Sequence, residues 1–137
     1  MDYSGGCHCG AIEIIYCTDI NPSRWNLRHD GCSFCRRHGV IATSDSAGSL
    51  SIKINDPAKV RYYRFAHRTA DFLLCGDCGV FVAAITDSAR GPRAVINART
   101  LQAISLNWSA VMDAHFDEES PEQRAERRLL HWTPVLT

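Results

Sequence analysis

Six of the seven cysteines in this 137-residue chain fall into close pairs, and these pairs are the strongest chemical feature of the sequence. The pairs are Cys7 with Cys9, Cys32 with Cys35, and Cys75 with Cys78, while Cys17 stands alone. An odd number of cysteines, in a sequence that shows no signal peptide, argues against a disulfide framework. Cysteines separated by one or two residues in a reducing compartment are typical metal ligands. The pattern therefore predicts a zinc protein.

The first and third pairs share one feature, which is a glycine directly after the second cysteine. Gly10 follows Cys9 and Gly79 follows Cys78. Glycine allows a turn with positive φ, so that backbone N–H groups can point at the sulfurs and stabilise their charge. Four thiolates form a closed, structural zinc site, and we expect one here, held by Cys7, Cys9, Cys75 and Cys78. The alternative is four small buried hydrophobic side chains, because free cysteine is often buried.

Arg36 and Arg37 directly follow the middle pair, Cys32 and Cys35. Nearby guanidinium groups favour the thiolate, so we expect these two thiols to be more reactive than average. Three interpretations stay open: two ligands of a second, open metal site, a redox pair, or a second structural clip. The redox interpretation is weak because no βαβ pattern surrounds the motif. The candidates to complete a metal site are Asp30, His29 and His38.

Short strand patterns dominate the first two-thirds of the chain. Alternating or β-branched runs predict strands at residues 12–16, 50–54, 60–65, 72–74, 80–85 and 93–97. Strands spaced this closely, without helical patterns between them, indicate antiparallel sheets rather than βαβ units. Nothing marks a domain boundary, so we expect residues 1–137 to form a single, mainly β domain with a short C-terminal helix.

The C-terminal helix has a clear start. Ser120 is a typical N-cap, Pro121 suits the first helical position, and Gln123 completes a capping box. The helix is expected to bury Ala125, Leu129, His131 and Trp132. Its remaining charged residues are expected to form a solvated face, consisting of Glu122, Arg124, Glu126, Arg127 and Arg128.

The charge balance excludes one large class of function. Basic and acidic residues number 15 each, so the formal net charge is zero and nucleic-acid binding is not expected. No run approaches the ~20 apolar residues that a membrane span needs. We therefore expect a cytoplasmic protein without a membrane partner.

Three linked motifs together resemble the glutathione-dependent formaldehyde-activating enzyme family, which includes centromere protein V. They are Gly5-Gly-Cys-His-Cys-Gly-Ala-Ile12, Cys32-Ser-Phe-Cys-Arg-Arg-His-Gly39 and Cys75-Gly-Asp-Cys-Gly79. The resemblance covers residues 5–116 and implies a zinc-containing, all-β Mss4-like fold. It also implies a structural zinc on Cys7, Cys9, Cys75 and Cys78, in agreement with the argument from the glycines.

Members of this family with lyase activity carry a second zinc on a C-x-C-x-x-C motif, where the metal is thought to meet the glutathione thiol. In this sequence the last two positions are Cys32 and Cys35, but the first is Asp30. A carboxylate can bind zinc, although it is a harder ligand than a thiolate. We therefore expect one firmly bound structural zinc and a second ion that is weak or absent.

Two functions follow from the resemblance. The first is a carbon–sulfur lyase acting on a glutathione-type thiol adduct of a small aldehyde, with metal ligands at Cys32, Cys35 and Asp30. Arg36 and Arg37 would then attract the carboxylates of the substrate. The second is a zinc-stabilised binding module without chemistry, which has lost the second metal. Metal content distinguishes them, because the enzyme needs a second, exchangeable zinc.

Overall fold

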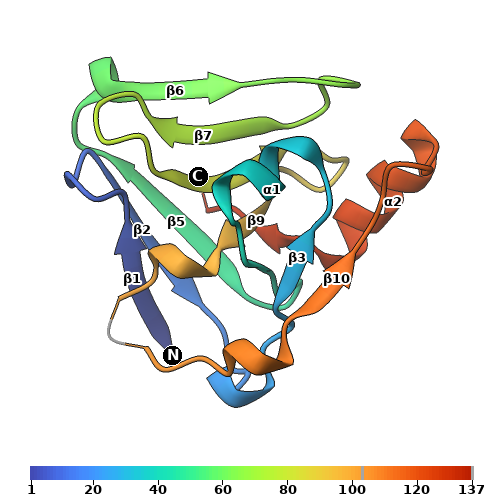
Figure 1. Cartoon of the computed structure of the whole chain (residues 1–137), viewed down its shortest axis with the longest axis horizontal. Helices are drawn as coiled ribbons and strands as arrows, with labels where there is room; N and C mark the ends of the chain where they lie inside the picture. The colour runs from blue at the N-terminus through green and yellow to red at the C-terminus, as the bar shows by residue number, and fades with distance from the viewer. Residues whose placement is uncertain (103, 137) are drawn as a thin grey trace.

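The computed structural model describes residues 1–102 and 104–136, and it contains two β-sheets (Figure 1). The smaller sheet has the order β1 (Asp2–Gly6), β2 (Ile12–Cys17) and β5 (Ser49–Ile54). The larger sheet has the order β10 (Met112–Ala114), β3 (Arg28–Asp30), β4 (Ala42–Thr43), β9 (Arg93–Asn97), β8 (Phe81–Thr86), β7 (Asp71–Cys75) and β6 (Val60–Tyr63), and β11 (Thr133–Pro134) pairs with β9. Neighbouring strands run antiparallel except β3 and β10, which are parallel. The predicted mainly β fold with antiparallel sheets is confirmed.

Helical segments occupy the connections. The α-helices are α1 (Ser33–His38) and α2 (Pro121–His131), and short 3-10 turns lie at Pro22–Arg24, Pro57–Lys59, Ala98–Thr100 and Trp108–Ala110. No helix in the described ranges is long and apolar enough to cross a membrane.

The main core contains buried side chains from both sheets. Ile12, Ile14 and Tyr16 alternate with exposed residues along β2, as the sequence pattern predicted. They belong to the same core cluster as Val82 of β8 and Ile96 of β9. Burying an aliphatic side chain of this size contributes roughly 1.5–3 kcal/mol, so this cluster is a large stabilising element.

A second, smaller core brings the helices to the larger sheet. Phe81 and Ala84 of β8 pack with Cys35 of α1 and with Trp132, the C-cap of α2. Because β8 also contributes Val82 to the main core, it is buried along almost its whole length. Both α1 and the end of α2 are therefore fixed against one rigid strand.

The predicted start of the C-terminal helix is confirmed in atomic detail. The Ser120 hydroxyl accepts a hydrogen bond from the Gln123 N–H at 3.1 Å, and the Ser120 N–H donates to Gln123 Oε1 at 2.9 Å. The predicted faces of this helix were wrong in part, because Ala125 and His131 are exposed. The arginines that we expected in solvent are partly buried instead, with side-chain exposures of 13% for Arg124 and 18% for Arg127.

Candidate metal centres and the adjoining pocket

The four cysteines expected to hold a structural zinc meet at one point. Their sulfur atoms all lie within 4.8 Å of one another. The Cys7 and Cys9 sulfurs are 3.8 Å apart, and the Cys9 and Cys75 sulfurs are 3.5 Å apart. A tetrahedron with zinc–sulfur bonds of ~2.3 Å has sulfurs ~3.8 Å apart. The donor set and its spacing therefore fit a tetrahedral zinc ion.

The two turns that carry these cysteines have the same local design. Gly10 and Gly79 have φ values of +85° and +80°, the positive range that glycine adopts freely. The Ile12 N–H donates to the Cys7 sulfur at 3.2 Å, and the Cys78 N–H lies 3.4 Å from the Cys75 sulfur. Such N–H groups stabilise thiolate charge, as the glycines in the sequence indicated.

This cysteine group connects the two sheets. One pair lies in the turn between β1 and β2 of the smaller sheet. The other pair lies at the end of β7 and in the turn before β8 of the larger sheet. Cys75 is fully buried. A zinc ion held here would cross-link the two sheets, which is a structural role.

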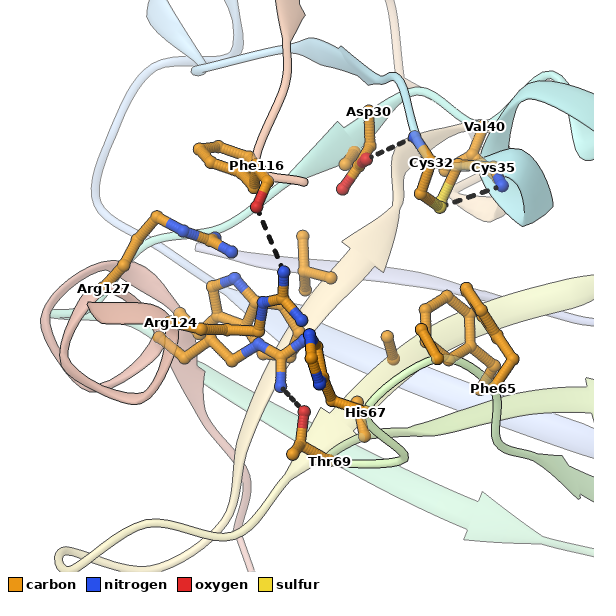
Figure 2. Close-up of a pocket in the computed structure, with 18 of the residues that line it drawn as sticks. Asp30, Cys32, Cys35, Val40, Phe65, His67, Thr69, Phe116, Arg124 and Arg127 are labelled. Carbon is orange, nitrogen blue, oxygen red and sulfur yellow. Dashed lines mark hydrogen bonds between the residues drawn. The ribbon is translucent and has the colours of Figure 1, made fainter. Parts of the chain in front are cut away.

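The second group contains Asp30, Cys32 and Cys35, whose ligand atoms also lie within 4.8 Å of one another (Figure 2). Asp30 ends β3, Cys32 is the N-cap of α1, and Cys35 lies in the first turn of that helix. The Cys35 N–H donates to the Cys32 sulfur at 3.2 Å. Three ligands leave at least one coordination position open, which is the arrangement of a catalytic rather than a structural metal site.

The two thiols of this group differ electrostatically. The hydrogen bond from the Cys35 thiol, helped by backbone N–H groups, lowers the pKa of Cys32. The same hydrogen bond, together with burial, raises the pKa of Cys35. Cys32 is therefore the thiol that ionises first, mainly because the Cys35 thiol donates a hydrogen bond to it.

Gly31, between Asp30 and Cys32, packs closely against β10 and the residue that follows it, and this contact brings β10 next to the second ligand group. Gly31 donates its N–H to the Ala114 carbonyl at 2.8 Å, continuing the parallel pairing of β3 with β10. A Cβ at Gly31 would overlap the imidazole of His115. The glycine therefore lets the chain after β10 run past the ligand group, and Phe116 reaches the pocket as a result.

A pocket opens beside Asp30, Cys32 and Cys35 (Figure 2). Its apolar side includes aromatic side chains from the larger sheet and the segments beside it, namely Phe65, Phe72, Phe81 and Phe116. Its polar side comes mainly from α2, which contributes Arg124, Arg127 and Arg128. Figure 2 shows the Asp30 carboxylate and Cys32 on one side of this space and Arg124 with His67 on the other.

A family model described as glutathione-dependent formaldehyde-activating enzyme matches residues 2–118. The chain belongs to this family. A crystal structure of a Rhodobacter sphaeroides protein, a structural genomics target, is similar, with 28% sequence identity and a TM-score of 0.63. The similarity covers 81% of this chain and 99% of that one. No curated protein matches the chain.

In this member of the formaldehyde-activating enzyme family, the structure brings one of the three candidate ligands to the two cysteines and leaves the other two outside the group. Asp30 joins Cys32 and Cys35, whereas His29 and His38 are exposed and lie outside that ligand group. His38 instead stacks on Phe34, with ring centroids 4.4 Å apart. The residue pattern had left Asp30, His29 and His38 open as the third ligand, and the resemblance to the family had pointed to Asp30, which the structure places in the group.

The arginines expected to meet a substrate are not those that line the pocket. Arg36 and Arg37 are exposed and absent from the described pocket lining, and Arg37 donates to the Ser33 carbonyl at 2.9 Å. The pocket arginines all belong to α2, beyond the last residue of the family match. Their one sequence signal is the spacing 124, 127 and 128, which puts three cations on one helix face.

Proposed function

We propose that this protein makes and breaks the carbon–sulfur bond between a glutathione-type thiol and a small aldehyde. The observation that carries the proposal is the position of Asp30, Cys32 and Cys35, whose ligand atoms converge at the wall of a pocket. A zinc ion bound there would lower the pKa of a substrate thiol and act as a Lewis acid. Membership of the formaldehyde-activating enzyme family supports the same reaction class.

The reaction balances without an oxidant or a reductant. A bond forms between the thiol sulfur and the carbonyl carbon, and the thiol proton ends on the carbonyl oxygen. The reverse reaction breaks that bond and restores the thiol and the aldehyde. Cys32, Cys35 and Asp30 would hold the metal, and the aromatic side of the pocket, which includes Phe81, would exclude water from the reacting carbon.

One observation favours a second function, a zinc-stabilised binding module without chemistry. Because the third residue of the second group is Asp30 rather than a cysteine, the group has only two thiolates. An oxygen ligand reduces the preference of the site for zinc. In this alternative the four-cysteine site maintains the fold, and the pocket binds a ligand without catalysing a reaction.

The test is the rate at which glutathione and formaldehyde interconvert with their adduct, measured by NMR exchange with zinc-loaded protein. We expect catalysis above the spontaneous rate, and we expect Cys32→Ser to remove it. Cys17→Ser is the matched control, because Cys17 lies at the end of β2 and outside both ligand groups. A wild-type rate equal to the spontaneous rate, in protein that holds two zinc ions, would exclude this enzyme activity and leave the binding module.

A further inference from the structure

Helix α2 presents three guanidinium groups to one pocket. Arg124, Arg127 and Arg128 follow a spacing of three and four residues, so they share a helix face, and all of them line the pocket. The family match ends at residue 118, before α2 begins at Pro121. This cationic wall therefore belongs to the part of the chain that the family model does not cover.

The carboxylate nearest to these arginines, that of Glu119, already interacts with two of them. Glu119 accepts hydrogen bonds from Arg127 Nε at 2.7 Å and from Arg127 Nη2 at 3.0 Å. Arg124 Nε is 3.6 Å from the same carboxylate, and Arg124 also donates to the Phe116 carbonyl at 3.1 Å. One carboxylate thus serves two guanidinium groups and is held mainly by Arg127.

Arg128 has no such partner within the described residues. Its Nη1 donates to the Thr69 hydroxyl at 2.8 Å, and no acidic oxygen lies within 4.0 Å of it in the described part of the chain. Its Nε is buried without a hydrogen-bond partner there. Burial, followed by the charges of Arg127 and Arg124, lowers the pKa of Arg128 to about 10.

The position of the Arg128 side chain is nevertheless well defined. Its guanidinium lies over the ring of Trp132, 4.7 Å from the centroid, and Trp132 is buried against β8. A partly buried cation that is fixed in place and surrounded by other cations favours an anion beside it. Among the described residues, the acidic groups that line the pocket are Asp30, which lies in the ligand group, and Asp117, which is exposed.

We propose that Arg128, assisted by Arg124, forms a carboxylate-binding subsite for the end of the substrate remote from its sulfur. A guanidinium matches the planar geometry of a carboxylate with two parallel hydrogen bonds. The Asp30 group and the α2 arginines line the same pocket, so a ligand with a thiol at one end and a carboxylate at the other would engage both. The identity of this ligand as a substrate rests on the proposed function, but the subsite itself does not.

The experiment is calorimetric titration of the zinc-loaded protein with S-methylglutathione, which carries the carboxylates but cannot form the adduct. We expect Arg128→Gln to raise the dissociation constant at least about tenfold, equivalent to about 1.4 kcal/mol. Arg90→Gln, in an exposed turn away from the pocket, removes the same charge and should leave binding unchanged. Thermal unfolding of each variant checks that the fold is retained.

A second comparison needs no variant. The dimethyl ester of S-methylglutathione should bind the wild-type protein more weakly than the acid, because its carbonyl groups have no charge. Equal dissociation constants for acid and ester, equal constants for wild type and Arg128→Gln, or no binding of the acid would each overturn the subsite. Binding that depends on Arg128, together with adduct exchange at the spontaneous rate, would refute only the proposed reaction.

Discussion

The Asp30 carboxylate accepts a hydrogen bond from the backbone N–H of Cys32 at 2.9 Å through its Oδ1 atom. This contact orients the carboxylate beside the two thiols of the second ligand group. Groups that hold a ligand in position increase metal affinity, because less order has to be imposed on binding. The aspartate is therefore part of the site by geometry, although it is a harder ligand than a thiolate.

The two ligand groups should contribute very differently to stability. Cys75→Ser removes a ligand of the site that joins the two sheets, so we expect insoluble or unfolded protein, as chelation of that zinc would also give. Cys32→Ser should remain folded, because the four-cysteine site does not need it. Thermal unfolding monitored by circular dichroism measures the difference.

Cys17→Ser serves as the control for loss of a thiol outside both groups. If Cys32→Ser melts as low as Cys75→Ser, the assignment of structural and open sites is wrong. Zinc content of the soluble fractions, measured in parallel, shows whether unfolding and metal loss coincide.

The capping box of α2 should be worth a measurable amount of stability. Ser120→Ala removes the acceptor for the Gln123 N–H, and such N-cap losses cost about 1 kcal/mol. Ser46→Ala, at an exposed position without a described hydrogen bond, is the matched control. Chemical unfolding of zinc-loaded protein gives the difference, and equal stabilities for the two variants would contradict the role of the cap.

The sequence was sufficient to predict the four-cysteine site because turn geometry is local. A cysteine followed by glycine beside a strand end leaves few conformations, and Gly10 and Gly79 adopt the expected positive φ. The strands with clear alternation, such as β2, were also predictable. Short elements such as β3 and α1 were missed, since three to six residues carry little periodic signal.

The pocket arginines could not be assigned from the sequence for a different reason. Arg124, Arg127 and Arg128 alternate with glutamates, which is the ordinary pattern of a solvated helix face. Their burial depends on the chain after β10, which brings α2 to the second ligand group through long-range packing. No local pattern encodes that approach.

Replacing Glu119 should strengthen anion binding while it weakens the attachment of α2. The Arg127 guanidinium holds the pKa of Glu119 below its usual range, so its stabilising contribution is present above that range and is lost as the pH falls through the folded pKa. At neutral pH, Glu119→Gln removes this charge and releases donors of Arg127. We expect tighter binding of S-methylglutathione and a lower melting temperature.

Glu126→Gln, at an exposed position of the same helix, is the control for removing one negative charge. Weaker binding in Glu119→Gln than in this control would show that Glu119 positions the arginines rather than competing for them. That result would contradict the prediction but leave the role of Arg128 to its own test.

Asp30→Cys should raise zinc content from close to one ion per chain towards two. The four-cysteine site is closed and should keep its ion during dialysis against a moderate chelator. The second group has two thiolates and one carboxylate, and its open position admits the chelator. A third thiolate would complete the cysteine pattern of the family and increase the preference for zinc.

The same substitution tests whether this second ion is the catalytic one. If the proposed reaction is right, Asp30→Cys should increase the rate of glutathione–formaldehyde adduct exchange together with the second zinc. Asp117→Cys adds a thiol to the lining of the same pocket without completing the ligand group, so it should change neither quantity. Elemental analysis before and after dialysis is the deciding measurement. Two equally retained zinc ions in the wild type would contradict the prediction, because Asp30 would then be a fully competent ligand. The observation that favours the binding module would no longer hold, and the rate of adduct exchange alone would decide between the two functions.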